Sequence, residues 1–319
     1  MAQLVDMGPR RWNRNLKSPW GVTAAIDNVI RQMEIAHVGL LPDLSLGQEL
    51  VLVSDYSGQH KMATHEAFSF LIASLPFCWL WDEKRRESRK SFLSDSRRMS
   101  YKSLNDRRRR RALMPFLEAA DWIPGVLITF LVDKSFTSKL TVESKDSLEI
   151  PSEFRNWEIQ TLQKLVWISH LGALMVAGLS SPGQDVFWFT DSDDIVANDR
   201  RVIDLTPFLA GMMSDYSDQQ MGHFKFGTTK CDCGDLMIED LASLPDLAAG
   251  ALCEIPVRGI LPQFSGVRIP VRGHVPAKAH AILAWLSTQR RSLSRICVVI
   301  DEGDSPGRAR VRALEFWPD

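Results

Sequence analysis

Three short apolar runs rich in β-branched and aromatic residues precede the first long helical pattern of the chain. They are Leu50–Val53, Ala67–Ala73 and Val126–Asp133. The short link between the first two runs predicts a hairpin, which the third strand extends. Residues 152–178 carry apolar residues at helical spacing and predict a long amphipathic helix. Because three strands come before this first crossover helix, we expect an α/β fold with a mixed sheet and helices packed on it.

Later segments alternate between strand and helix patterns. The predicted elements are a strand at Val186–Asp191, a helix over 201–216, a strand at Leu236–Ile238, a helix beginning at Leu244, a helix over 277–291 and two closing strands at Ile296–Ile300 and Ala309–Phe316. The 319 residues suffice for about two domains or for one domain with additions. We divide them into an N-terminal extension (1–47), a core (48–255) and a C-terminal helix with a strand hairpin (256–319).

The charge of the chain is unevenly distributed. Residues 84–111 contain 13 Lys or Arg and 3 Asp or Glu, a net charge of +10, in a chain whose net charge is −1. Hairpin links usually have 2–5 residues, so this much longer link between the second and third strands indicates a basic insertion into the sheet.

The arginines of this insertion are candidates for nucleic-acid binding. Guanidinium groups bind phosphate through two donors, and such contacts are independent of base sequence and weaken with salt. For this role the segment has to be exposed to solvent. The alternatives are docking on an acidic partner protein and docking on the acidic remainder of this chain. The candidate residues are Arg97, Arg98, Arg107, Arg108, Arg109, Arg110 and Arg111.

Three aspartates occupy comparable places in the predicted elements. Asp55 ends the first strand, Asp191 ends the strand after the long helix, and Asp246 opens a late helix. Asp193 and Asp194 are further acids, but they fall beyond the strand in the following loop. Carboxylates at strand ends and helix starts can meet at one edge of a sheet and hold Mg²⁺ or Mn²⁺. Taken singly, an Asp in a turn is ordinary turn chemistry.

This layout resembles the RNase H-like superfamily, in which three antiparallel strands are followed by a helix, a strand and alternating helices and strands. It is most similar to bacterial RNase H-like domains of unknown function, which carry Asp-Glu-Ser-Gly on the first strand and a late Ala-Asp-Leu-x-Ala-Gly. The matching segments are Asp55-Tyr56-Ser57-Gly58 and Pro245-Asp246-Leu247-Ala248-Ala249-Gly250. The resemblance covers residues 48–255 and implies a two-metal nuclease with Asp55, Asp191 and Asp246 as metal ligands and catalytic residues.

The chain departs from this pattern at two places. Tyr56 stands where the family has Glu, and Pro245 replaces the small residue before the late Asp. RNase H enzymes also use a Glu on their first helix. The candidates here are Glu153 and Glu158, of which Glu158 lies further inside the predicted helix and is the candidate fourth catalytic carboxylate.

Two functions from different classes follow from these observations. The first is a Mg²⁺- or Mn²⁺-dependent nuclease that cleaves phosphodiester bonds. The second is a catalytically inactive RNase H-like scaffold or binding subunit of a larger complex, such as a defence or mobile-element complex. Convergence of the three aspartates favours the enzyme, whereas an Arg or Lys that fills their pocket favours the scaffold.

Three sequence features bear on the cellular compartment of the protein: the N-terminal residues, the length of the apolar runs and the number of cysteines. Residues 1–20 contain no apolar leader segment, and the apolar runs are too short to span a membrane. Five cysteines are too few, and odd in number, for a disulfide framework. We therefore expect a cytoplasmic protein without a membrane partner.

Overall fold

A computed structural model describes residues 12–13, 16–60, 63–140, 151–232, 234–255, 266–270, 275–288, 292–305 and 307–317. The described residues form a mixed α/β fold, as predicted, with one eight-stranded sheet in the order β5-β4-β1-β2-β3-β7-β8-β6. The strands are β1 (Glu49–Ser57), β2 (His65–Ser74), β3 (Gly125–Asp133), β4 (Asp185–Thr190), β5 (Phe224–Thr228), β6 (Gly266–Pro270), β7 (Leu293–Glu302) and β8 (Ala309–Trp317).

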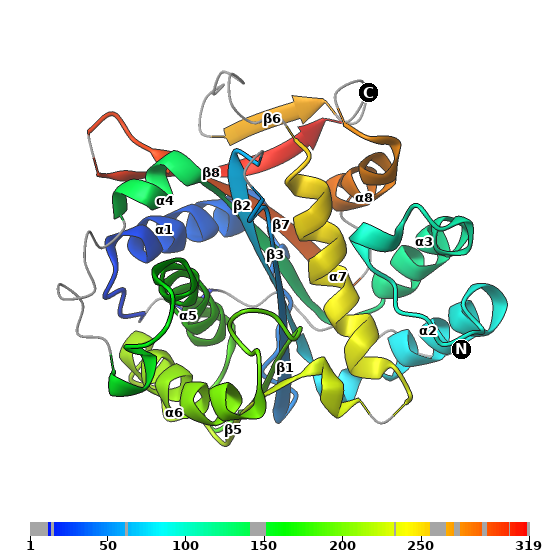
Figure 1. The fold of residues 1–319 in the computed structure, drawn as a ribbon, viewed down its shortest axis with the longest axis horizontal. Coiled ribbons are helices and arrows are strands. Elements are labelled where there is room, and N and C mark those ends of the chain that lie inside the picture. Colours follow the sequence, from blue (N-terminus) through cyan, green and yellow to red (C-terminus); the bar gives the residue numbers. More distant parts are fainter. Residues whose placement is uncertain are drawn as a thin grey trace.

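Helices cover both faces of this sheet (Figure 1). They are α1 (Gly21–Ala36), α2 (Trp79–Phe92), α3 (Arg107–Ala120), α4 (Lys134–Leu140), α5 (Ile159–Leu179), α6 (Asp199–Tyr216), α7 (Met237–Leu252) and α8 (Ala277–Ser287). In Figure 1, α1, α5 and α6 lie on one side of the strands, whereas α2, α3, α7 and α8 lie on the other.

The first three strands form the predicted meander. β1 pairs with β2 and β2 with β3, both antiparallel, whereas β4 runs parallel to β1 and β5 parallel to β4. β7 then pairs in parallel with β3, and β8 returns antiparallel to β7. The C-terminal segment therefore continues the same sheet.

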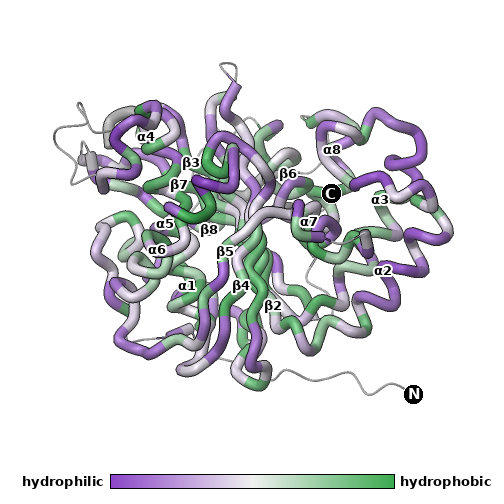
Figure 2. Tube along the Cα trace, turned by 60° about the horizontal axis from the view of Figure 1, so that its bottom comes forward, coloured by the Kyte–Doolittle hydropathy of each residue, from purple (hydrophilic) through white to green (hydrophobic). Residues whose placement is uncertain are grey.

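Alternation along the strands builds a core on each face. Leu50 and Leu52 of β1 pack in the cluster that includes α1, α5 and α6, whereas Val51 and Val53 pack in the cluster that includes α3, α7 and α8. This follows from the two-residue period of a strand, which sends successive side chains to opposite faces. The strands form a hydrophobic band between the helical layers in Figure 2.

The helix α5 is, within the part of the chain that the structure describes, the one helix long and apolar enough to cross a membrane. However, 78% of its most apolar stretch is buried inside the protein. Burial of this extent is typical of the core helix of a soluble protein.

One predicted strand is wrong. Leu236–Ile238 enters a helix, because α7 begins at Met237 and runs to Leu252. The carboxylate of Asp232 accepts the backbone N–H groups of Leu236, Ile238 and Glu239, and so caps the helix from outside. A run of three apolar residues is too short to distinguish the spacing of a helix from that of a strand, whereas the cap from Asp232 stabilises the helix. The strand at this point in the fold is β5 instead.

The basic segment is folded rather than an exposed arm. Residues 84–111 form most of α2, the connection that follows it and the start of α3. Arg85 and Arg89 are buried, with Arg85 only 1% exposed. The exposure predicted for a nucleic-acid arm is therefore wrong for these arginines, although the outer parts of α2 and α3 are hydrophilic in Figure 2.

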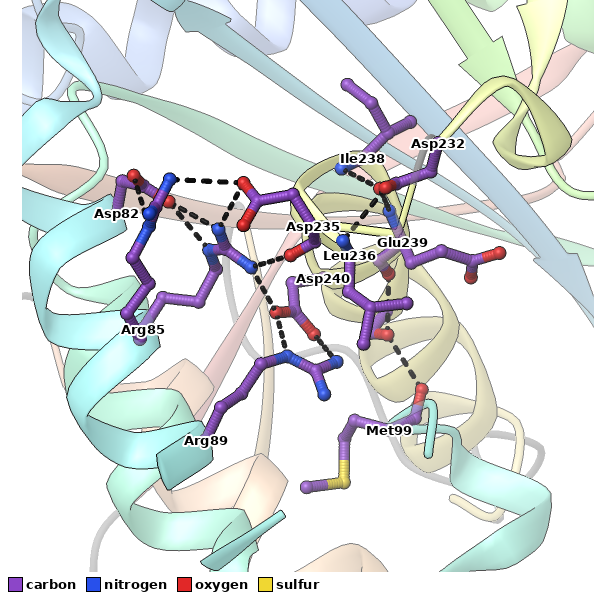
Figure 3. A network of polar contacts seen from close by, with 12 residues as sticks. Asp82, Arg85, Arg89, Met99, Asp232, Asp235, Leu236, Ile238, Glu239 and Asp240 are labelled. Atoms are coloured by element: carbon purple, nitrogen blue, oxygen red, sulfur yellow. Dashed lines mark hydrogen bonds and ion pairs between the residues drawn. The ribbon is translucent and has the colours of Figure 1, made fainter. Parts of the chain in front are cut away.

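A buried carboxylate on α7 holds these arginines (Figure 3). Asp240 is fully buried, and its Oδ2 accepts from Arg85 at 3.2 Å and from the Nε of Arg89 at 2.5 Å. A second guanidinium nitrogen of Arg89 bonds the other Asp240 oxygen. Arg85 also bonds Asp82 of its own helix and Asp235 before α7. This network fastens α2 to the first turn of α7.

We expect Asp240→Asn to lower the free energy of unfolding by about 3–5 kcal/mol, because it leaves the buried guanidinium of Arg89 without its counter-charge and removes one of the three acids that pair with Arg85. Urea unfolding measures this loss. The matched control is Asp218→Asn, which breaks an exposed pair with Lys17 and should change the free energy by less than about 1 kcal/mol. A loss for Asp240→Asn no larger than that of the control would contradict the role of the network.

Candidate functional site

The parallel pairing of β1 with β4 brings two of the three predicted aspartates side by side. Ser54 of β1 is paired with Thr190 of β4. Asp55 follows Ser54 along the chain, and Asp191 follows Thr190. Successive side chains of a strand point to opposite faces of the sheet, so residues two apart share a face. Asp55 and Asp191 therefore lie on the same face as Val53, which packs in the cluster that includes α7.

The third aspartate comes from the helix that covers this face. Asp246 lies inside α7, which packs across β1 and β2. The prediction that Asp246 opens a helix is therefore wrong, because α7 begins nine residues earlier. The helix nevertheless packs against β1 and β4, and convergence of the three side chains stays a prediction.

Burial and neighbouring acids act in the same direction on the pKa values of Asp55 and Asp246. Burial raises the pKa of Asp55 well above its usual value, and the negative charges of Asp246 and Asp191 raise it further. Burial likewise raises the pKa of Asp246 to about 6, with Asp191 contributing in the same direction. Ionisation of Asp55 and of Asp246 is therefore unfavourable in the folded protein.

The three side chains differ in their partners. Asp246 Oδ2 accepts the backbone N–H of Tyr101 at 2.6 Å, which fixes its orientation. Asp55 has no hydrogen bond or ion pair among the described residues. Asp191 pairs with Arg98: the arginine Nη1 lies 3.5 Å from Asp191 Oδ1, and the arginine Nη2 lies 3.3 Å from Asp191 Oδ2. Thr229 adds a hydroxyl 3.4 Å from Asp191 Oδ1.

Two residues that the sequence analysis did not single out complete the charge pattern. Glu239 of α7 pairs with the Nε of Arg98, so that this arginine bridges two acids. Glu239 lies seven residues before Asp246, two helical turns away on the same face, and this spacing is the signal that could have found it.

Lys164 of α5 brings a second cation to the site. It pairs with Asp193, its Nζ lies 4.9 Å from the centre of the Tyr56 ring, and its charge lowers the pKa of Asp55. Asp193 in turn raises the pKa of Asp55. This loop acid therefore belongs to the surroundings of the site, and no spacing in the sequence indicated Lys164.

Glu158 stands apart from its predicted place. It is the residue before α5, which begins at Ile159, so its expected position inside the helix is wrong. Glu158 lines a cavity of about 880 Å³ together with Glu66, Lys134 and Lys164. Lys164, which lines this cavity, also lowers the pKa of Asp55.

The predicted nucleic-acid-binding arginines divide into two groups. Arg97 pairs with Asp95 and Asp106, and Arg108 and Arg109 pair with the same two acids. Of the seven predicted arginines, Arg107, Arg110 and Arg111 are exposed and form no ion pair with a described residue, whereas Arg98 pairs with Asp191 and Glu239.

The possible metal ligands of this cluster are the carboxylate oxygens of Asp55, Asp191 and Asp246. In the described segments no group of three or more His, Cys, Asp or Glu side chains is arranged to hold a metal ion. The oxygen donors suit Mg²⁺ or Mn²⁺, and Asp55 offers an unpaired carboxylate. The guanidinium of Arg98, however, covers the oxygens of Asp191. As described, the three aspartates are therefore not arranged as a metal centre, and a shared cation stays a prediction.

Comparison of the chain with protein-family models, with curated proteins and with solved structures finds no match. The geometry of the site therefore carries the functional argument.

The raised pKa of Asp246 predicts a pH-dependent stability. The folded protein holds this proton more tightly than the unfolded chain does, so ionisation destabilises the fold as the pH rises from about 4 through 6. Asp246→Asn removes this cost while its amide oxygen still accepts from Tyr101. Relative to wild type, we expect it to gain about 1–3 kcal/mol at pH 8 and much less at pH 4 in urea unfolding.

The control is the exposed Asp218→Asn, measured at the same two pH values, whose effect should stay below about 1 kcal/mol. An Asp246→Asn effect that is independent of pH would contradict the strained, buried carboxylate.

Proposed function

We propose that this chain is a divalent-metal-dependent nuclease with an RNase H-like core, in which Asp55, Asp191 and Asp246 hold Mg²⁺ or Mn²⁺. The observation that carries the proposal is the register of β1 and β4, which brings Asp55 and Asp191 to neighbouring positions on the face of the sheet that α7, with Asp246, covers. Carboxylates that are costly to ionise together are stabilised by a shared cation.

The strand order supports the RNase H-like part of the proposal. The strands β3-β2-β1-β4-β5 lie side by side, the first three antiparallel and the last two added in parallel to β1. This is the layout that the sequence resemblance implies. The helices α2 and α3 lie between β2 and β3 in the chain, at the place of the expected insertion.

The start of α3 supports an anionic substrate. Five arginines, 107–111, occupy its first turns, next to the positive end of the helix dipole, where cations are unfavourable. Asp106 caps the helix by accepting the N–H of Arg108, but α3 has no acid in its first turn. A bound phosphate strand would compensate this charge, and departures from local stability rules are expected at functional sites.

Each residue has a defined part in the proposed reaction. Bound divalent cations activate a water molecule and stabilise the leaving oxygen of a phosphodiester. Asp55 contributes its unpaired carboxylate, and Asp246 is oriented by the N–H of Tyr101. Lys164 pairs with Asp193, and its positive charge lowers the pKa of Asp55. Arg98 has to release Asp191 before the site is complete.

A second candidate function is an inactive RNase H-like binding subunit. The observation that favours it is the pair of cations already in the site, Arg98 on Asp191 and Lys164 on Asp193. In a decayed site such cations replace the metal permanently. Cation-dependent cleavage distinguishes this function from the nuclease.

We expect the wild-type chain to cleave at least one substrate of a panel of single- and double-stranded DNA and RNA in the presence of Mg²⁺ or Mn²⁺. Asp55→Asn should abolish this cleavage, because a neutral amide is a poor ligand for a hard cation. It should leave the fold intact, because Asp55 has no partner to lose among the described residues.

Asp218→Asn is the control and should cleave like wild type. Wild-type cleavage by Asp55→Asn would contradict the assigned site. Absence of cation-dependent cleavage by the wild-type chain over the whole panel would favour the binding subunit.

The exposed arginines of α3 generate a separate prediction about binding. Changing Arg107, Arg110 and Arg111 to Ser should weaken nucleic-acid binding similarly for all sequences and flatten its salt dependence. On duplex DNA, each lost phosphate contact changes the slope of log affinity against log salt by about 0.9. Arg310→Ser, on the distant strand β8, should leave the slope unchanged. Unchanged affinity of the triple variant, with loss of an acidic partner protein, would assign these arginines to protein binding instead.

A further inference from the structure

We propose that the cavity between the start of α5 and the carboxyl ends of β1, β3 and β4 is a binding site for a neutral, hydroxyl-rich small molecule, of the chemical class of sugars and polyols. The lining of this cavity contains none of the three aspartates of the proposed nuclease. The inference therefore goes beyond the proposed function and does not depend on it.

The cavity lies at the edge of the sheet where open α/β folds bind their ligands. The strands β1, β3 and β4 run in the same direction, and such folds bind ligands outside the carboxyl ends of their strands. Gln59 follows β1, Lys134 follows β3 and Asp194 follows β4, and all three line the cavity. Its volume of about 880 Å³ is in the range of sites for small organic molecules.

The polarity of the lining excludes an apolar ligand. Of the described residues that line the cavity, Ile159 and Ala197 are the apolar ones, whereas the others carry charged, amide or hydroxyl groups. Sites for apolar ligands are lined mainly by hydrophobic and aromatic side chains. The occupant of this cavity therefore has to form hydrogen bonds over most of its surface.

Each wall of the cavity carries one acid and one cation. The walls are the β2–β3 pair, the start of α5, and the segment from β4 into α6, which contribute Glu66 and Lys134, Glu158 and Lys164, and Asp194 and Arg201 respectively. An ionic ligand requires an excess of one sign, and a zwitterion requires the two signs at separate poles. A hydroxyl group both donates and accepts, so a ligand with many hydroxyls matches this alternation of acids and cations.

The acids of the cavity are free to accept hydrogen bonds from a ligand. Within the described ranges, the carboxylates of Glu66, Glu158 and Asp194 form no hydrogen bond or ion pair. Burial raises the pKa of the half-buried Glu66, whereas the charges of Lys134 and Lys164 lower it. A partly buried carboxylate without a partner is costly, because water solvates it incompletely. A ligand hydroxyl that donates to Glu66 removes this cost.

The cations are held in place and keep further donors for a ligand. Lys134 Nζ donates to the carbonyl of His60 at 2.8 Å, which uses one of its three N–H groups. Arg201 donates to the carbonyl of Asp194, and its guanidinium carbon lies 4.2 Å from the centre of the Trp157 ring. Side chains that are already oriented lose little conformational freedom when a ligand binds.

The first test is the binding of uncharged and charged probes to the full chain, measured by saturation-transfer NMR and calorimetric titration. The neutral probes are glucose, ribose, trehalose and myo-inositol, and the charged probes are glutamate, inorganic phosphate and spermidine. We expect at least one neutral probe to bind, and to bind more tightly than every charged probe. Binding of no neutral probe at millimolar concentration would overturn the proposal, as would tighter binding of a charged probe.

The second test assigns the binding to this cavity. Glu66→Met removes the carboxylate and keeps an unbranched side chain, and it should fold because Glu66 has no described partner to lose. We expect it to weaken binding of the neutral probe by about tenfold or more, because it removes a hydrogen bond to a charged group. The matched control is Glu118→Met, which removes an exposed acid from a separate cavity lined by α2 and α3 and should leave the affinity unchanged.

A second variant keeps the test decisive if Glu66→Met does not fold. Glu158→Gln changes an exposed side chain just before α5 and should also weaken binding of the neutral probe. Wild-type affinity of the folded Glu66→Met chain, or of Glu158→Gln where Glu66→Met is unfolded, would overturn the assignment to this cavity. An equal loss of affinity in Glu118→Met would overturn it as well.

Discussion

The buried contact between Asp240 and the arginines of α2 determines where the rest of the site can lie. A fully buried carboxylate is costly unless it is paired, and Arg85 and Arg89 supply the pairing from another helix. Because α2 is held on α7, the connection from α2 to α3 runs alongside α7. Tyr101 thus reaches Asp246, and Arg98 reaches Asp191.

The sheet contributes the second constraint. The parallel pairing of β1 with β4 places Asp55 beside Asp191, and alternation turns both toward the helix that carries Asp246. The proposed metal site therefore depends on two separate features: the register of β1 with β4, and the ion pairs of Asp240 that hold α2 against α7. The opposite core, built around α5, contributes Lys164 at the same end of β1.

The sequence predicted the parts of this structure that depend on local pattern. Apolar runs rich in β-branched and aromatic residues located the meander and β4. The prediction that Asp55 ends the first strand was wrong by two residues, because β1 continues to Ser57. The partners of the arginines were not predictable, because Asp240 lies about 150 residues from Arg85 and a run of basic residues looks the same whether it faces water or a buried carboxylate. Leu236–Ile238 was too short to reveal its period, and the start of α5 shifted Glu158 outside the helix.

The central claim is that Asp55, Asp191 and Asp246 share a divalent cation. A crystal structure of the wild-type chain with Mn²⁺ and an uncleavable oligonucleotide tests it most directly, through the anomalous scattering of manganese. The account predicts an anomalous peak bound by oxygens of all three aspartates. A fully occupied Arg98–Asp191 pair and no manganese at these carboxylates would contradict it.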